Sequence, residues 1–176
     1  MNRTTASEGT VMQDRSTVDR TSDRELVVER TIRGPSRIVF DAWTKPELFK
    51  QWWVPKSAGV TLLSCEQDVR VGGGYRLVFS FQGSEMAFFG TYREVVPCSR
   101  IVWTNDEAGD AGQVTTVTFE EKAGKTLVVM RELYPSKEAL DAAIASGSTA
   151  GEEATNETFE QLEEFVATLV AGVGRS

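Results

Sequence analysis

The chain has 176 residues, of which 40% are hydrophobic and 26% charged, so it holds enough apolar material for one globular domain with a short tail. Its net charge of -7 argues against nucleic-acid binding, because a protein that displaces counterions from phosphates needs a basic surface. It contains no histidine, which excludes Ser-His-Asp sites, Cys-His sites and histidine-ligated metal centres. We assign no catalytic residue and no metal ligand, and we expect no cofactor.

The sequence also predicts the cellular compartment. Residues 1–22 lack the apolar run of a signal peptide, and no stretch approaches the ~18 apolar residues of a transmembrane helix. We therefore expect a cytoplasmic protein without membrane insertion. Cys65 and Cys98 do not form a Cys-x-x-Cys pair, and we expect both to be reduced thiols.

The N-terminal part of the chain begins with a segment that shows no periodicity. Residues 1–22 are rich in Thr, Ser, Asp and Arg, which predicts a disordered leader, with order beginning near Arg24. Alternation over residues 25–33 predicts a strand. Two short helices should follow, one between Pro35 and Lys45 and one from Pro46 to about Trp53.

From residue 60 to residue 134 the pattern predicts strands throughout, separated by turns that contain glycine or proline. The six predicted strands span residues 60–71, 75–81, 86–96, 101–105, 113–122 and 126–133. Gly72-Gly73-Gly74 connects two of them and lacks the GxxxxGK[ST] pattern, so it is interpreted as a turn and not as a phosphate-binding loop.

The C-terminal part of the chain is predicted to be helical. Ser136 is a suitable N-cap for a helix over residues 137–145. A long amphipathic helix follows, in which Phe159, Leu162, Val166 and Leu169 form one apolar stripe. The folded domain should span residues 23–171, with a flexible C-terminus over residues 172–176.

This order of elements predicts an α+β fold in which a curved antiparallel sheet of about six or seven strands wraps around the long C-terminal helix. A twisted sheet does not close perfectly on one helix, so an apolar cavity is expected between them. Each candidate lining residue has ordinary core packing as its alternative. The candidates are Trp52, Trp53, Tyr75, Phe79, Phe88, Tyr92, Trp103, Met130, Phe159 and Leu162.

Charged residues on the predicted central strands are candidates for a polar anchor in this cavity. They are Glu94, Arg131 and Glu132. A carboxylate that points inward would have a raised pKa and could act as an acid or a base. The alternative is a cross-strand ion pair that faces solvent, and the direction of each side chain decides between the two.

Several local motifs occur in one consistent order along the chain. They are Val39-Phe40-Asp41-Ala42-Trp43-Thr44 with Pro46-Glu47, Gln51-Trp52-Trp53-Val54-Pro55, Val69-Arg70-Val71-Gly72-Gly73, Phe89-Gly90-Thr91-Tyr92-Arg93-Glu94-Val95 and Asn156-Glu157-Thr158-Phe159. This series resembles the START-like superfamily, also called SRPBCC, and within it the family named after the activator of heat-shock-protein ATPase. The resemblance implies a helix-grip fold with a ligand cavity.

The chain departs from the family pattern at two places. Val54 stands where glycine is usual, and Ala154-Thr155 stands where a Gly-Trp or Gly-Met pair is common. Both changes could alter the cavity wall, so the resemblance does not carry over a ligand preference.

Three functional hypotheses remain open. The first is a binding protein for a small, largely apolar partner, lipid-like or aromatic. The second is a stress-linked, co-chaperone-like module that contacts a protein partner through its acidic last helix. The third, a small-molecule cyclase or hydrolase, needs an inward acid–base pair, for which the sequence has candidates but no signature. A monomer is expected, and the sequence leaves a dimer open.

Overall fold

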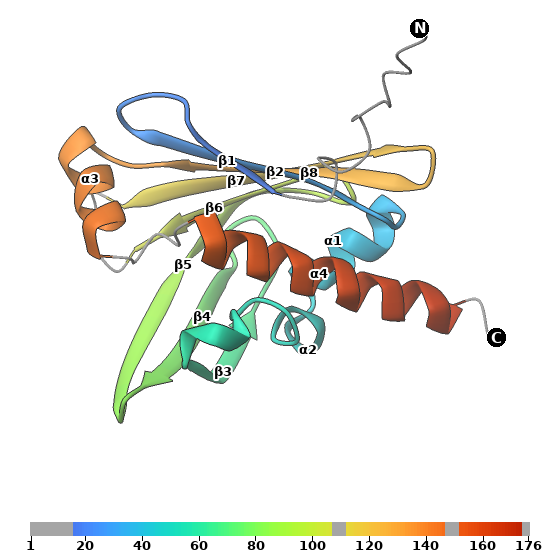
Figure 1. Ribbon diagram of the computed structural model, residues 1–176, viewed down its shortest axis with the longest axis horizontal. Coiled ribbons are helices and arrows are strands. Elements are labelled where there is room, and N and C mark those ends of the chain that lie inside the picture. Colours follow the sequence, from blue (N-terminus) through green and yellow to red (C-terminus); the bar gives the residue numbers. More distant parts are fainter. Residues whose placement is uncertain (1–15, 107–111, 147–151, 174–176) are drawn as a thin grey trace, which may run out of the picture.

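The computed structural model describes residues 16–106, 112–146 and 152–173 (Figure 1). The strands are β1 (Thr17–Arg20), β2 (Glu25–Ile32), β3 (Thr61–Gln67), β4 (Gly74–Phe81), β5 (Ser84–Val96), β6 (Arg100–Asn105), β7 (Gln113–Lys122) and β8 (Lys125–Leu133). The helices are α1 (Ser36–Thr44), α2 (Pro46–Phe49), α3 (Lys137–Ser146) and α4 (Glu152–Val173), with a 3-10 turn at Lys56–Ala58. No helix of these residues is long and apolar enough to cross a membrane.

The strands form one antiparallel sheet in the order β1-β2-β8-β7-β6-β5-β4-β3. The sheet bends so that β3, β4 and the first half of β5 project away from the other strands, and α4 lies in the angle (Figure 1). This arrangement confirms the predicted helix-grip fold.

The bend in the sheet lies within the long strand β5. Its residues 84–91 pair with β4, whereas residues 92–96 pair with β6, and the register shifts between Tyr92 and Glu94. Such an irregularity bends a strand and increases its twist. Gly90 lies at this point, where a Cβ atom would stand 1.7 Å from the carbonyl oxygen of Thr104. Only glycine therefore allows β5 and β6 to approach each other this closely.

The core lies between the concave face of the sheet and the helices α1 and α4. The predicted stripe of α4 is confirmed in the core, since Phe159, Leu162 and Val166 are each at most 1% exposed and Leu169 is partly buried. Val39 of α1 is fully buried in the same cluster. Burying a side chain of this size stabilises a fold by about 1.5–3 kcal/mol relative to leaving it exposed.

One correction concerns the predicted leader. Residues 17–20 form β1, which pairs with β2 from Thr17–Glu29 to Arg20–Leu26. The strand is too short and too polar to show an alternating pattern, and backbone pairing with its neighbour stabilises it. The remainder of the predicted leader, residues 1–15, lies outside the described residues.

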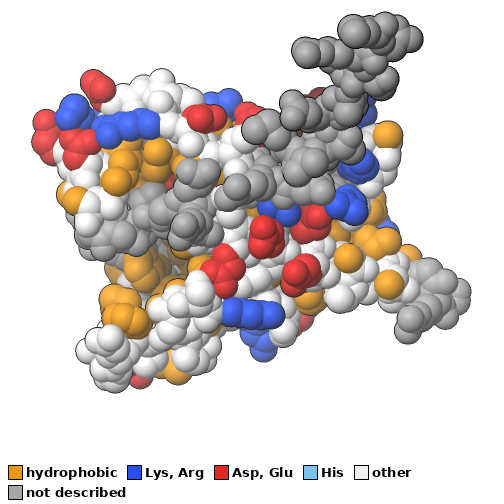
Figure 2. All heavy atoms as spheres, in the orientation of Figure 1, with side chains coloured by type: hydrophobic (Ala, Val, Ile, Leu, Met, Phe, Trp, Pro, Cys, Tyr) orange, Lys and Arg blue, Asp and Glu red, His pale blue; other side chains and the backbone are white. Residues whose placement is uncertain are grey.

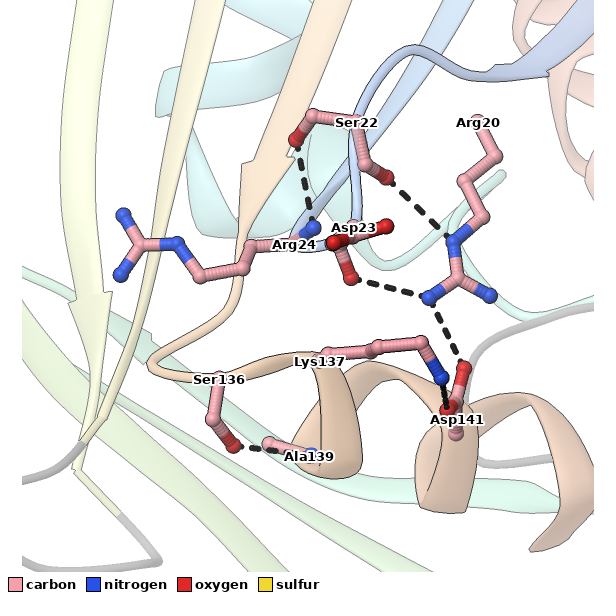
Figure 3. A network of polar contacts seen from close by, with 8 residues as sticks. All are labelled: Arg20, Ser22, Asp23, Arg24, Ser136, Lys137, Ala139 and Asp141. Carbon is pink, nitrogen blue, oxygen red and sulfur yellow. Dashed lines mark hydrogen bonds and ion pairs between the residues drawn. The ribbon is translucent and has the colours of Figure 1, made fainter.

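Polar contacts join the end of β1 to the start of α3 (Figure 3). The guanidinium of Arg20 donates to the carbonyl oxygens of Ser22 and Asp23 and lies 2.8 Å from a carboxylate oxygen of Asp141. Lys137 also pairs with Asp141, at 2.7 Å.

At the C-terminus, α4 continues to Val173, so the expected flexible end cannot begin at residue 172. Residues 174–176 lie outside the described range.

Candidate functional site

A cavity of about 350 Å³ opens between the concave face of the sheet and the helices α1, α2 and α3. Every strand from β3 to β8 contributes to its wall. The described lining residues are Trp43, Phe49, Trp53, Gln67, Tyr75, Leu77, Phe79, Phe88, Tyr92, Ile101, Trp103, Asn105, Gln113, Glu132, Tyr134 and Ala143.

Aromatic rings form a continuous wall on one side of the cavity. The ring of Trp43 lies 5.8 Å from that of Trp53 and 6.1 Å from that of Trp103, measured between centroids. Tyr75 continues the series, at 6.5 Å from Trp103 and 5.8 Å from Tyr92. Such edge and tilted contacts suit the quadrupoles of the rings, so the wall is rigid as well as apolar.

The two adjacent tryptophans have different roles. Trp52 is fully buried, and its indole N–H donates to the carbonyl oxygen of Ala42 at 3.0 Å, whereas Trp53 faces the cavity. Gln161 of α4 fixes this segment, because its amide nitrogen donates to the carbonyl oxygens of Trp52 and Val54 at 2.9 and 2.8 Å. Through these contacts α4 positions the segment that carries Trp53, although Gln161 itself does not line the cavity.

A chain of hydrogen bonds forms the polar end of the cavity. The hydroxyl of Tyr75 donates to Oδ1 of Asn105 at 2.8 Å, and the amide nitrogen of Asn105 lies 3.3 Å from Oε1 of Gln113. The side chain of Gln113 in turn hydrogen-bonds the carboxyl of Glu132. Four strands therefore contribute to one polar cluster beside the aromatic wall.

Glu132 is the charged residue of this cavity. Among the described lining residues it is the only aspartate, glutamate, lysine or arginine. Burial raises its pKa from 4.5 to about 7, because the carboxylate loses hydration, and the hydrogen bond with Gln113 opposes part of this effect. Near neutral pH this carboxyl is therefore divided between its neutral and ionised forms.

A second polar contact lies where β3 meets the aromatic wall. The amide nitrogen of Gln67 donates to the carbonyl oxygen of Trp43 at 3.2 Å and to the hydroxyl of Tyr92 at 3.3 Å. Burial raises the pKa of Tyr92, so its phenol stays neutral.

Burial also raises the pKa of Cys65 to about 11, and both Cys65 and Cys98 are free. A protonated thiol is a poor nucleophile, so Cys65 is not a candidate for covalent chemistry.

Six of the ten predicted lining residues face the cavity, and four do not. Trp52, Met130, Phe159 and Leu162 are at most 7% exposed and belong to the packed core. None of the described side chains of α4 lines the cavity, which corrects the expectation that it would lie against the last helix. The apolar stripe of α4 packs against α1 and the sheet, so the shorter helices cover the remaining space.

The structure separates the three candidate polar anchors. Glu132 faces the cavity, but its neighbour Arg131 points the other way and pairs with Glu25 at 3.4 Å. Glu94 pairs with Arg100 at 3.2 Å on the exposed surface. Two of the three candidates thus belong to cross-strand ion pairs, and of the three only Glu132 lines the cavity.

The prediction missed nine lining residues, which include much of the polar end. They are Trp43, Phe49, Gln67, Leu77, Ile101, Asn105, Gln113, Tyr134 and Ala143. Asn105 and Gln113 flank a predicted loop, and they become partners only because β6 pairs with β7 in the register that joins them. Their position next to a hairpin turn was the available signal, but two amides at a loop are too common to indicate a site.

Two of the acidic residues of α4, Glu157 and Glu163, have partners within the chain. Glu163 lies 3.6 Å from Arg30 and 3.7 Å from Arg33. Glu157 accepts hydrogen bonds from the backbone and side chain of Ser57, which lower the pKa of its carboxyl. Figure 2 shows acidic and basic side chains next to one another along this helix. The helix therefore does not present a uniform acidic face.

A bent antiparallel sheet that holds a C-terminal helix and encloses an aromatic cavity defines a helix-grip protein of the START-like class. The profile of the family described as "Activator of Hsp90 ATPase homolog 1-like protein" matches residues 33–167, and the chain belongs to this family. This finding confirms the resemblance derived from the motifs.

Solved structures of bacterial proteins have the same fold. A protein from Nitrosomonas europaea is 22% identical with a TM-score of 0.75, over 86% of this chain and 99% of that one. A protein from Rhodobacter sphaeroides is 21% identical with a TM-score of 0.77, over 87% and 99% of the two chains. A protein from Staphylococcus epidermidis is 28% identical with a TM-score of 0.69, over 86% and 94%. No curated protein matches the sequence.

Proposed function

We propose that this protein binds a small, largely apolar molecule in the aromatic cavity. The observation that carries the proposal is a space of about 350 Å³ with a mainly aromatic and aliphatic wall and a few polar groups that converge at one end. Sites for small molecules have this character, with volumes of roughly 300–1,000 Å³. The apolar wall would supply affinity, and the polar cluster would orient the molecule.

The other two hypotheses receive less support. The enzyme hypothesis drew its acid–base candidates from Glu94, Arg131 and Glu132, and of these Arg131 and Glu94 face away from the cavity. The co-chaperone hypothesis placed the contact on the acidic last helix, where Glu157 and Glu163 are already bound within the chain. Binding of a small molecule accounts for the aromatic wall and the polar cluster of the cavity, which the other two hypotheses leave unexplained.

The test uses the neutral fluorescent probe N-phenyl-1-naphthylamine. Trp43, Trp53 and Trp103 line the cavity, so a bound probe should accept excitation energy from them. We expect saturable binding with a stoichiometry of one.

Helix α3 provides a matched pair of variants for this experiment. Ala143 lines the cavity, whereas its neighbour Ile144 is 47% exposed. Ala143→Trp should fill part of the space and weaken probe binding at least tenfold, while Ile144→Trp adds a ring to the surface and should leave binding unchanged. Equal binding by both variants and the parent would count against the cavity as the site, and absence of saturable binding to the parent would refute the proposal.

A further inference from the structure

Resting on the proposed function, we infer that the cavity selects organic cations, meaning an amine or quaternary ammonium group attached to an apolar body. The inference rests on the placement of one carboxyl beside a wall of aromatic rings. It deepens the proposed function by naming the chemical class of the ligand.

The sheet places the aromatic rings and the carboxyl in one row. In the pairing of strands, Tyr92 lies opposite Trp103, Trp103 opposite Thr115, and Thr115 opposite Glu132. Residues paired in this way point to the same face, here the concave one. Adjacent strands are about 4.8 Å apart, so the backbones of Trp103 and Glu132 are separated by about 10 Å. The short side chain of Thr115 lies between them and is itself buried, whereas Trp103 and Glu132 both line the cavity.

The aromatic wall attracts positive charge. The face of an aromatic ring carries negative charge density, and a cation within about 6 Å of the ring centroid is stabilised by about 0.5–2 kcal/mol. The rings of Trp43, Trp53, Trp103, Tyr75 and Tyr92 line one side of the cavity. Quaternary ammonium groups are typically recognised by cages of this kind.

The charges of the site point in the same direction. No lysine or arginine is present among the described lining residues, so an anionic ligand would meet Glu132 without a counter-ion. The chain as a whole carries a net charge of -7, which also favours the approach of cations. A bound cation would give the Glu132 carboxylate the charged partner that the described lining residues do not provide.

The groups around Glu132 are uncharged. Its strand neighbours are Leu26 on β2 and Thr115 on β7, and the side chain of Gln113 hydrogen-bonds it. Within the part of the chain that the structure describes, the other titratable groups that line the cavity are the phenols of Tyr75, Tyr92 and Tyr134. The carboxyl of Glu132 is therefore the group that titrates between pH 6 and 8, with a pKa of about 7.

This titration predicts how cation binding depends on pH. A permanently charged ligand favours the ionised carboxyl, which is about 9% of the molecules at pH 6 and about 91% at pH 8 for a pKa near 7. The affinity for a quaternary ammonium ion should therefore rise about tenfold between these two pH values. The affinity for a neutral molecule should not rise.

Three compounds of equal size test the inference: benzyltrimethylammonium, its neutral carbon isostere neopentylbenzene, and the anion benzylsulfonate. Each competes with N-phenyl-1-naphthylamine at pH 6 and pH 8. We expect the cation to bind at least tenfold more tightly than its isostere at pH 8 and the anion to bind most weakly. Glu132→Gln should abolish the preference and its pH dependence while keeping the binding of neopentylbenzene. Glu94→Gln is the matched control, because that carboxylate faces away from the cavity.

The outcomes separate a failure of the cation inference from a failure of the proposed function. If neopentylbenzene competes as well as the cation, or if the probe binds and the cation does not displace it, the cation inference fails and the proposed function stands. If no probe or compound binds, both fail. The comparison of cation and isostere in the parent protein is decisive even if Glu132→Gln does not fold.

Discussion

Glu132 should make the protein less stable as the pH rises. The folded chain binds a proton on this carboxyl up to a pKa of about 7, whereas an unfolded chain holds it only up to the ordinary value of 4.5. Between these pH values the native state binds more protons than the unfolded state, so the free energy of unfolding falls as the pH rises. The stabilisation from the neutral carboxyl is complete below pH 4.5 and is lost once the pH has passed through 7.

The magnitude follows from the same two pKa values. At 1.36 kcal/mol for each pH unit, the change from 4.5 to about 7 corresponds to about 3 kcal/mol. The side chain is partly accessible from the cavity, where water screens its charge, and we therefore expect about 2 kcal/mol between pH 5 and pH 8. Glu132→Gln keeps the shape of the side chain and cannot ionise, so this loss should be absent from the variant.

The assay is urea denaturation followed by tryptophan fluorescence, with the parent, Glu132→Gln and the exposed control Glu94→Gln. The other carboxylates of the chain titrate in all three proteins, so the informative quantity is the difference in unfolding free energy between variant and parent. For Glu132→Gln this difference should grow in favour of the variant by about 2 kcal/mol from pH 5 to pH 8. A difference that stays constant over this range would refute the reasoning, because the carboxyl would then have the same pKa in both states.

Two further predictions concern the framework of the site. Gln161→Leu removes the partners of the carbonyl oxygens of Trp52 and Val54 and of the backbone N–H of Lys56, and should cost about 3 kcal/mol in urea denaturation. A loss below 1 kcal/mol would contradict the role of this clamp. Ala123 has a φ of 54° before Gly124 in the β7–β8 turn, and asparagine tolerates this conformation better. Ala123→Asn should therefore raise the unfolding free energy by about 0.5–1 kcal/mol. A lower melting temperature of the variant would contradict the argument that the backbone conformation of Ala123 lowers stability.

A stability loss at Glu132 bears on function. A glutamine at this position would avoid the cost of ionisation at neutral pH, yet the chain carries a carboxyl there. Functional sites often keep groups that lower stability because their chemistry is needed. The proposed role as a partner for a bound cation gives this carboxyl such a chemistry.

Local patterns in the sequence were sufficient for most of the elements and for their order. Alternation of polar and apolar residues is a property of a strand on its own, and the spacing of Phe159, Leu162 and Val166 is a property of a helix on its own. The same patterns failed for β1, because a short polar strand is stabilised by the neighbour with which it pairs and not by its own sequence. The absence of histidine, which excludes whole classes of site, also required no structure.

The tertiary structure decided which residues form the cavity. Arg131 and Glu132 are neighbours on one strand, so one of them must face inward, but the choice depends on the pairing of β8 with β2 and β7. Similarly, the bend in β5 determines that Trp53 and Trp103 line the same cavity, whereas the apolar stripe of α4 packs in the core. The periodicity of a helix or strand is a local property of the backbone, so it can be recognised in the sequence. The cavity depends on the register and curvature of strands that are far apart in the chain.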